Sequence, residues 1–406
     1  MSLRTLRFLT AGESHGPMLV GILDGLPAGI PLDIARVDAE LRRRMGGYGR
    51  GKRMKIEADA ARFVGGIRHG ETIGSPIAWL IENKDWVNWQ SVMDTAPRAG
   101  GATAESGNSP GPVESRRITR PRPGHADLAG GLKYNRTDLR DILERASARE
   151  TAARVAAGAV AKQFVGCLGI EITSHVVRIG AAAYADDADP VTFAAAAAAD
   201  ESLVRCADAD LGAAMINAID AAHNDLETLG GAFEVIAAGV PVGLGSHTQW
   251  DRRLEARLGQ ALLSIQAQKG VEIGPAAWCS AQPGSRAHDP IERDGDEWFK
   301  RPSNKAGGTE GGMTYGGELR LTVYMKPLAT LRQPLPSVDI ETGEAVDAVV
   351  QRSDVCAVPA AGVVGEAMVA LVLADACLEK FGGDSLGETK RNFDGYIEQT
   401  QRYPDA

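Results

Sequence analysis

The sequence predicts an α+β fold, because short strands and helices follow one another in mixed order. A doubly wound sheet would instead show a regular alternation of strands and helices. Hydrophobic residues make up 44% of the 406-residue chain and charged residues 24%, both near the averages for globular proteins. This composition allows a sizeable buried core, and no linker rich in Pro, Gly or Ser marks a clear domain boundary.

The N-terminal part of the chain begins with two expected strands, Leu6–Thr10 and Met18–Leu23, on either side of a turn that contains glycine and histidine. Asp33 can cap an amphipathic helix that runs to about Met45. A loop rich in glycine and arginine follows. Three further strands are expected after it, at 54–57, 62–65 and 77–82.

A long helix is expected from a cap at Thr137 or Asp138 to about 166–169. Its apolar residues recur at helical spacing: Leu139, Ile142, Leu143, Ala146, Ala153, Val160 and Phe164. The segment 181–200 is rich in alanine and aspartate, which predicts a surface insertion. Further helices are expected at 251–269, 360–381 and 387–402.

Two glycine-rich segments, 94–125 and 283–317, predict long loops. Loops of this length usually have a function, so we expect them at an active site or an interface. A short sequence echo also occurs, since Asp24-Gly-Leu-Pro-Ala-Gly-Ile30 resembles Ala238-Gly-Val-Pro-Val-Gly-Leu244. It suggests a duplicated β–α unit.

The net charge of −9 argues against a general binder of nucleic acid or of an anionic membrane. The five cysteines are odd in number and form no Cys-x-x-Cys pair, so neither a disulfide framework nor a structural zinc site is expected. The N-terminus shows no signal peptide, and no stretch reaches the roughly 18 apolar residues of a membrane span. The sequence therefore predicts a soluble cytoplasmic protein that is not bound to a membrane.

Six basic residues without an acid lie in the glycine-rich segment 42–53. The segment fits G-x-x-x-x-G-K, but Arg53 stands where a P-loop needs serine or threonine, and the segment precedes a strand instead of a helix. We reject a P-loop. Arginines on such a loop suit a small polyanion, although a solvated basic face would look the same.

A second basic segment, Arg116–Asp127, holds Arg122 and His125 on a backbone stiffened by two prolines. If a phosphate binds there, a protonated His125 could act as general acid for its departure. A structural proline-rich loop is the alternative.

Three further segments carry polar residues that could transfer protons. Gly12-Glu13-Ser14-His15-Gly16 lies between two apolar strands and does not match a nucleophile elbow. Arg145 and Arg149 would share one face of the long helix, where a salt bridge with Glu144 or Glu150 is the simple explanation. Asp354 precedes an apolar helix, so it could be a cap or a base held by arginine.

Seven segments together resemble the chorismate synthase family. They are GESHG at 12–16 with DGLPAG at 24–29, RRRMGGYGRGKRMKIE at 42–57, RPRPGHADLAG at 120–130, ERASARETAARVAAGAV at 144–160, SIQAQKGVEIG at 264–274, NKAGGTEGGMTYG at 304–316 and RSDVCAVPAAGVVGEAM at 352–368. The segments occur in the family's order and cover almost the whole chain. The resemblance implies one large domain over 1–406, with a β–α–β sandwich core in which helices lie between mixed or antiparallel sheets.

The resemblance also implies an activity, that of a carbon–oxygen lyase acting on phosphates in aromatic amino acid biosynthesis. The substrate would be 5-enolpyruvylshikimate 3-phosphate, which loses phosphate and a ring proton in a trans-1,4-elimination to give chorismate. The family requires reduced FMN, although the reaction is redox-neutral overall. The implied assembly is a homotetramer.

Site residues follow from the resemblance. His125 would protonate the leaving phosphate, His15 would lie near flavin N1, and Asp354 with Ser14 and Ser147 would relay a proton from flavin N5. The substrate anions would be held by Arg43, Arg50, Arg53, Arg122 and Arg352. Cofactor contacts would come from Arg43, Arg50, Arg145, Ala146, Ser147, Gln266, Ala267, Gly311, Lys326, Pro327, Leu328, Ala329, Thr330 and Arg352, of which Arg43 and Arg50 match contacts to a reduced nicotinamide.

The chain departs from the family at Leu328 and Ala329, where Ile-Ser is more usual. No metal motif is present, and we expect no metal. No flavin-reductase domain is recognisable, so an external flavin reductase is expected to supply reduced FMN, with NADPH only an indirect reductant. The alternative functions are a non-enzymatic phosphate- or nucleotide-binding protein and an RNA-contacting module, and the net charge of −9 disfavours the latter.

Overall fold

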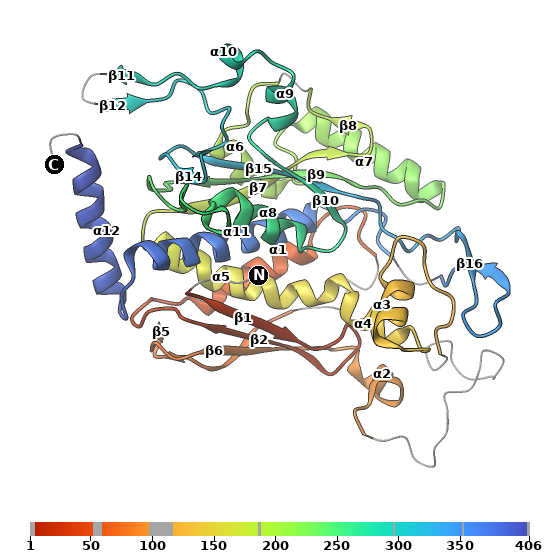
Figure 1. Ribbon diagram of the computed structural model, residues 1–406. Helices are drawn as coiled ribbons and strands as arrows, with labels where there is room; N and C mark the ends of the chain where they lie inside the picture. Colours follow the sequence, from red (N-terminus) through yellow and green to blue (C-terminus); the bar gives the residue numbers. More distant parts are fainter. Residues whose placement is uncertain are drawn as a thin grey trace.

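Two antiparallel sheets with a layer of helices between them make up the body of the protein (Figure 1). The computed structural model describes residues 5–51, 59–96, 117–185, 188–294, 297–350 and 353–403. The β–α–β sandwich that the family resemblance implied is confirmed. The strand expected at 54–57 lies outside the described residues.

The first sheet contains β1 (Arg7–Ala11), β2 (Met18–Asp24), β3 (Arg62–Gly65) and β6 (Ile77–Glu82) in the order β1-β2-β6-β3. All three pairings are antiparallel. Alternate residues of β2 and β6 are buried, as expected of strands with one face on a core. The inward residues include Leu19, Leu23, Ile77, Trp79 and Ile81.

The second sheet contains β7 (Glu171–Ile179), β8 (Ala182–Ala183), β9 (Gly231–Ala238), β10 (Gln268–Ile273) and β15 (Leu319–Met325). Its order is β10-β15-β9-β7-β8. Four shorter two-stranded pairings lie outside the two large sheets: β4 (Ile67–Arg68) with β5 (Glu71–Thr72), β11 (Glu292–Asp294) with β12 (Glu297–Lys300), β13 (Thr309–Glu310) with β14 (Met313–Thr314), and β16 (Pro336–Val338) with β17 (Ala345–Asp347).

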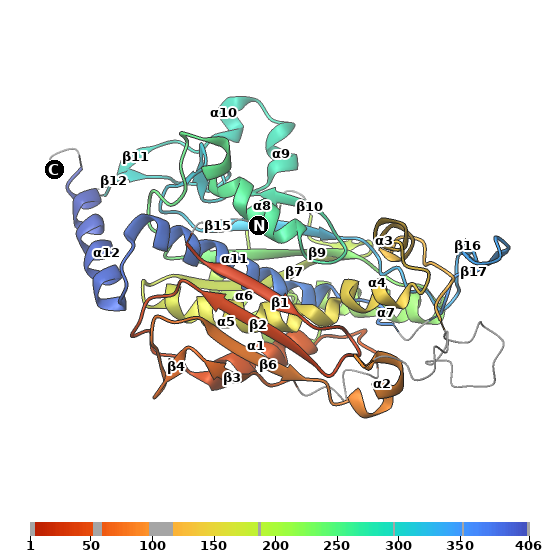
Figure 2. The ribbon, with the colours of Figure 1, turned by 60° about the horizontal axis from the view of Figure 1, so that its bottom comes forward.

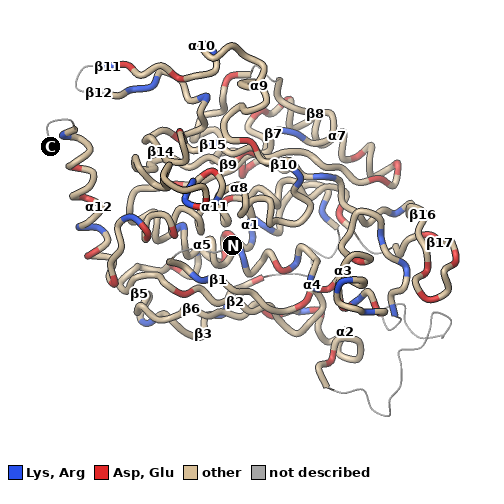
Figure 3. Tube along the Cα trace, in the orientation of Figure 1, with Lys and Arg blue, Asp and Glu red and all other residues tan. Residues whose placement is uncertain are grey.

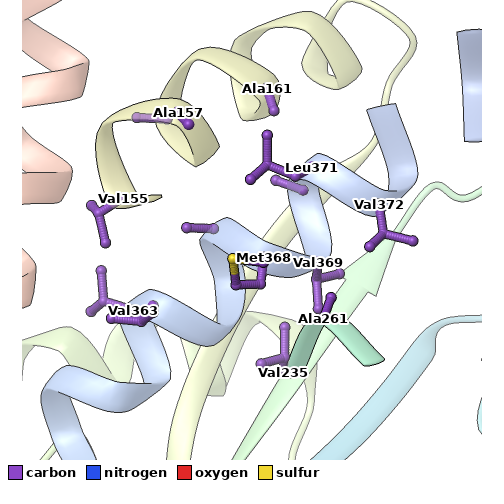
Figure 4. Close-up of a cluster of buried hydrophobic side chains, with 14 of the residues drawn as sticks. Val155, Ala157, Ala161, Val235, Ala261, Val363, Met368, Val369, Leu371 and Val372 are labelled. Carbon is purple, nitrogen blue, oxygen red and sulfur yellow. The ribbon is translucent and has the colours of Figure 1, made fainter. Parts of the chain in front are cut away.

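The helical layer is built around α5 (Thr151–Gly166) and α11 (Val358–Phe381), with α1 (Ile34–Met45) and α8 (Leu254–Leu263) packed beside α11. Figure 4 shows side chains of α5 and α11 meeting in the core, where Val155 lies near Val363 and Ala161 near Leu371. Gly158 allows the close approach, since a Cβ there would lie 2.3 Å from the Cα of Ala367.

The remaining helices surround this core: α2 (Trp86–Met93), α3 (Asp127–Tyr134), α4 (Arg140–Ala146), α6 (Phe193–Ala198), α7 (Ala209–Asn224), α9 (Ala276–Ser280), α10 (Gly284–Ala287) and α12 (Leu386–Gln401). Helix α12 and the β11–β12 hairpin project at one end of the body, near the C-terminus (Figures 1 and 2). Helices α2, α3 and α4 lie at the opposite end.

The two halves of the chain repeat the same topology. The main elements run β1, β2, α1, β3, β6 and α5 in the first half, and β7, β9, α8, β10, β15 and α11 in the second. Each set of four strands pairs in the same order, first-second-fourth-third. The sequence echo lies at matching places, after β2 and after β9, so the topology supports the duplicated β–α unit that the echo suggested.

Several predicted elements agree with the structure. Asp33 caps α1, its carboxylate accepting from the backbone N–H of Ala35 at 2.9 Å. The last two helices lie within two residues of their predicted starts.

The predicted long helix at 137–166 is wrong in one respect. Its chain leaves the helical conformation at Ser147, where ψ is 141°, and η4, a 3₁₀ turn at Ala148–Glu150, leads into α5. Apolar residues keep helical spacing across this break, which is why the pattern conceals it.

The helix predicted at 251–269 is also too long. It ends at Leu263, and residues from Gln268 onward belong to β10. The segment 181–200 contains β8 and α6, with Ala196 and Ala199 buried. The segment 283–317 contains α10, the β11–β12 hairpin and the β13–β14 hairpin.

The expectation that no segment is long enough to span a membrane needs correction. Helix α11 has 24 residues and sufficient hydropathy, but its apolar window is completely buried inside the protein, as in the core helix of a globular domain. It also carries Glu366 and Asp375, both fully buried and ion-paired. The five cysteines are free thiols, and Cys206, Cys356 and Cys377 are buried.

Candidate active site

The turn between β1 and β2 meets the break between α4 and α5. Here Ser14 is buried and its backbone N–H donates to the carbonyl of Glu144 at 2.9 Å. The hydroxyl of Ser147 donates to the hydroxyl of Ser14 at 3.3 Å. The structure therefore brings together the two serines that the resemblance paired, and the helix break is what exposes Ser147 to this contact.

His15 is held by a buried carboxylate. Its Nδ1 lies 2.8 Å from Oε2 of Glu144, and its backbone N–H donates to the same oxygen at 2.9 Å. Its ring stacks on Trp89 with centroids 3.7 Å apart. Burial alone would raise the pKa of Glu144, but the hydrogen bond and charge of His15, together with the charge of Arg140, lower it.

Arg145 and Arg149 do not share a helix face, contrary to the sequence expectation, because the chain breaks between them. Arg145 donates to the carbonyls of Gly12 and Thr10, both at 3.0 Å, and so fixes the β1–β2 turn. Arg149 pairs with Asp59 at 2.5 Å. Ala146 is half-buried at the end of α4.

A second histidine is held in the same way by Asp127, the first residue of α3. His125 Nδ1 lies 2.6 Å from Oδ1 of Asp127, and the Nε–H of Arg122 donates to Oδ2 at 2.8 Å. Burial alone would raise the pKa of Asp127, but these hydrogen bonds and charges lower it well below its usual range. Arg122 also donates to the hydroxyl of Thr330 at 2.8 Å.

The segment 326–330 lies beside this cluster. The ammonium of Lys326 donates to the carbonyl of Gly124 at 2.6 Å. Burial, with a smaller contribution from Lys269, lowers the pKa of Lys326. An open pocket of about 320 Å³ is lined by Pro123, Gly124, Glu227, Thr228, Lys326, Pro327, Leu328, Ala329, Leu331 and Leu335. Its size falls at the lower end of small-molecule sites.

Gln266 and Ala267 adjoin the same segment, since the backbone N–H of Lys326 donates to the carbonyl of Ala267 at 3.0 Å. Ala267 has a φ of 67°, which a non-glycine residue adopts only when its surroundings impose it. Gln266 donates to Glu150 at 2.7 Å, while its buried Oε1 has no hydrogen-bond partner among the described residues. An acceptor of this kind suits the N–H of a ring ligand.

Asp354 is held by the loop that follows α1. Arg50 pairs with its carboxylate at 3.0 Å, and the backbone N–H of Gly51 donates to it at 2.6 Å. It does not cap α11, whose N-cap is Ala357. Of the two readings that the sequence left open, the structure therefore shows the carboxylate held by arginine.

Hydrogen bonds to backbone carbonyls connect these groups around one end of the helical layer. Arg44 donates to the carbonyl of Ala148, beside Ser147. Leu229 donates to the carbonyl of Val355, and its neighbour Thr228 donates to the carbonyl of Leu328. Helices α3 and α4 then join the His125 and His15 clusters. Figure 3 shows that basic and acidic residues are interspersed along the described trace, including the elements that carry this site.

Arg43 lies apart from these groups, in a partly buried ion cluster around the buried carboxylate of Glu366. It donates to Glu366 at 2.8 Å, to Glu40 at 2.8 Å and to Asp200 at 2.6 Å, and these carboxylates raise its pKa against the effect of burial. Three acidic partners leave no favourable place for an anionic ligand.

Gly311 also lies apart. It forms the tip between β13 and β14, near the N-terminal end of α8, whereas Ala267 follows the C-terminal end of that helix. The ten residues of α8 span about 15 Å, so Gly311 and Ala267 lie at opposite ends of this helix. Arg53 and Arg352 lie outside the described residues.

Sequence reasoning gave no site role to Trp89 or Asp127, and it considered Glu144 only as an arginine partner. Asp127 could have been found, since it follows His125 by two residues. Glu144 and Trp89 are far from His15 in sequence and carry no local signal. Among the described residues, no group of three or more His, Cys, Asp or Glu side chains could hold a metal ion.

Comparison with known proteins gives one consistent result. Residues 6–378 match the family model described as chorismate synthase. The chain is 52% identical to the chorismate synthase of Solibacter usitatus, over 98% of this chain and 100% of that one. It is 55% identical to that of Streptomyces coelicolor, over 97% and 98% of the two chains.

A solved structure described as a crystal structure of chorismate synthase agrees over 99% of this chain and 100% of its own, with a TM-score of 0.78 and 42% identity. Sequence and fold thus point the same way over nearly the full length. The chain belongs to the chorismate synthase family.

Proposed function

We propose that the residues around His15, His125 and Asp354 form the active site at which this lyase converts 5-enolpyruvylshikimate 3-phosphate to chorismate. Family membership establishes the type of enzyme. The observation that best supports the site is the contact of 2.6 Å between His125 and the buried carboxylate of Asp127, beside Arg122. It places a protonatable imidazole among cations that attract a phosphate.

In this proposal, His125 gives a proton to the departing phosphate oxygen. Asp127 accepts from Nδ1, so the proton on Nε2 is the one to be transferred, and the carboxylate stabilises the imidazolium before transfer. Arg122 is fixed by Asp127 and Thr330 and orients the phosphate. Arg50, with Arg53 and Arg352, would hold the other anionic groups of the substrate.

Removal of the ring proton would be completed by Asp354. Arg50 and the Gly51 amide hold this carboxylate oriented towards the loop after α1. The hydrogen-bonded pair Ser14 and Ser147 would pass the proton, because each hydroxyl can both accept and donate.

Reduced FMN is the cofactor that the family implies, and the residues present fit it. The unpaired Oε1 of Gln266 can accept from a ring N–H, and the pocket beside 326–330 can take a flat ring edge. Arg145, Ala146, Ser147 and Ala267 would complete its surroundings. When bound, the cofactor supplies an electron transiently and accepts the departing hydrogen.

We further propose that NADPH serves only as an indirect reductant, through an external flavin reductase. The saturation of Arg43 by Glu366, Glu40 and Asp200 supports this, because a nicotinamide contact there would have to break a buried ion cluster. A cytoplasmic homotetramer is the assembly that the family resemblance supports.

Anaerobic incubation with reduced FMN and 5-enolpyruvylshikimate 3-phosphate tests the proposed reaction. We expect stoichiometric release of phosphate and chorismate, and no release with oxidised FMN under the same conditions. Absence of phosphate release with reduced FMN would sink the proposal.

A further inference from the structure

We infer that Glu144 is a positioning residue for His15, which it holds in one ring orientation with the proton on Nδ1. The inference rests on the proposed function for the part that His15 plays in the reaction. The orientation itself rests only on the contacts described below.

The carboxylate of Glu144 accepts hydrogen bonds from both the backbone and the ring of His15. Oε2 accepts from the backbone N–H at 2.9 Å and from Nδ1 at 2.8 Å, and Oε1 lies 3.0 Å from Nδ1. The side chain of Glu144 is 1% exposed, so water does not compete for these oxygens. Two hydrogen bonds from one residue fix both the loop and the ring.

The carboxylate determines which ring nitrogen carries the proton. Hydrogen bonding and charge from His15 and Arg140 keep the pKa of Glu144 below its usual value, so it is ionised at neutral pH and can only accept. Nδ1 must therefore donate. In neutral His15 the lone pair is then on Nε2, so Nε2 is the nitrogen that can accept a proton.

Trp89 stacks on a face of the His15 ring, whose edge is held by Glu144. The two rings are inclined by only 24°, and the indole N–H donates to Asp85 at 2.9 Å, which orients the indole. Arg140 contacts both partners of His15, since its guanidinium lies 5.4 Å from the Trp89 ring centre and 3.3 Å from Glu144. Among the described residues, these contacts bring the charged side chains of Glu144, Arg140 and, through Trp89, Asp85 to His15.

A similar carboxylate–histidine contact occurs elsewhere in the proposed site. Asp127 holds His125 through Nδ1 at 2.6 Å, again from a fully buried carboxylate. Two histidines with the same tautomer would both offer Nε2 to the reaction. A carboxylate that orients an imidazole is a general device for fixing its tautomer.

The test uses two measurements. Nitrogen-15 NMR of the apo protein, labelled at histidine, reports the tautomer, and phosphate release reports the turnover. His15→Gln identifies the His15 signals by their loss. We expect wild-type His15 to show a protonated Nδ1 and an unprotonated Nε2. Glu144→Gln keeps an accepting oxygen and should keep that tautomer, with turnover reduced about tenfold by the lost charge.

Glu144→Ala should populate both tautomers and reduce turnover about a hundredfold, with partial recovery when formate is added. Asp141→Ala is the matched control, because this exposed carboxylate on the same helix pairs with Arg136 at 2.6 Å and should change neither measurement. An unprotonated Nδ1 in the wild-type protein overturns the inference even if Glu144→Ala does not fold. Absence of phosphate release by the wild-type enzyme overturns the proposed function but leaves the tautomer result unaffected.

Discussion

Asp127 shows how one side chain can prepare two others for chemistry. Its two oxygens accept hydrogen bonds from His125 and Arg122, so the proposed proton donor and the proposed phosphate-orienting cation share one rigid anchor. The anchor is fully buried, and the first turn of α3 presents it. His125 itself remains partly exposed, as a group that must meet a substrate has to be.

Replacing His125 or Asp354 should therefore affect catalysis far more than stability. We expect His125→Ala and Asp354→Ala each to lower turnover by about a hundredfold or more, since each removes a positioned proton-transfer group. Thermal unfolding should shift by only a few degrees, because neither side chain belongs to the core. His247→Ala, an exposed histidine outside the site, is the control.

Phosphate release and thermal unfolding, measured on the same preparations, decide this prediction. If the two variants lose activity only in proportion to the fraction that is unfolded, His125 and Asp354 have no catalytic role.

The sequence indicated the candidate side chains of the site but not their partners. Ser14, His15, Arg122 and His125 stand out because they lie in short segments that contain glycine or proline, and Asp354 stands out because it precedes an apolar helix. Glu144 cannot be recognised in this way. It lies 129 residues from His15, and only the packing of α4 against the β1–β2 turn brings them together.

The break at Ser147 is the feature of the helices on which the site most depends. A continuous helix would carry Arg145 and Arg149 on one face, whereas the break turns Arg145 towards Gly12 and leaves Ser147 beside Ser14. The strands of the second sheet were equally hard to predict. In β9 all but three residues are buried, so it lacks the alternation that marks a strand with one exposed face.

The crossing of α5 and α11 depends on Gly158. A Cβ at this position would meet the Cα and Cβ of Ala367 at 2.3 Å and its carbonyl oxygen at 2.8 Å. Neither helix backbone can move without disturbing the other core contacts. We expect Gly158→Ala to lower the free energy of unfolding by about 1–3 kcal/mol, although alanine favours helix over glycine.

Gly166→Ala provides the contrast, because a Cβ at this last residue of α5 would meet nothing within 4 Å. It should leave stability unchanged or raise it by up to about 1 kcal/mol. Urea unfolding of both variants measures the two changes in the free energy of unfolding. Equal changes would contradict a crossing of α5 and α11 that depends on Gly158.

The duplicated topology gives the molecule two sheets but a single layer of helices, and a buried ion cluster joins its parts. Glu366 on α11 accepts from Lys162 on α5, Arg43 on α1, Arg205 and Ser174 on β7. The formal charge of −9 therefore says little about the interior, where several arginines and carboxylates neutralise one another. The sequence could not show this cluster, because its members come from five separate segments.

Glu366→Gln should be strongly destabilising. The change leaves three cations, of which Arg205 is buried and Arg43 and Lys162 are half-buried, without their shared buried anion. Breaking a buried ion pair costs about 3–5 kcal/mol. Glu388→Gln is the control, since its pairing with Arg391 on α12 is exposed and long at 3.8 Å. Such a surface pair contributes at most about 1 kcal/mol.

The pH dependence of the difference in unfolding free energy between wild type and Glu366→Gln tests whether lost charge causes it. Burial alone would raise the pKa of Glu366, but Lys162, Arg43 and Arg205 lower it well below its usual value. A carboxylate with a lowered pKa stabilises the folded state fully above its unfolded pKa of about 4.3, and this contribution is lost as the pH falls through the folded value. The gap in unfolding free energy between wild type and Glu366→Gln should thus be widest above about pH 5.5 and should narrow below about pH 4. Urea unfolding between pH 7 and pH 3 measures it, and a gap that stays constant over this range would mean that lost packing, and not lost charge, destabilises the variant.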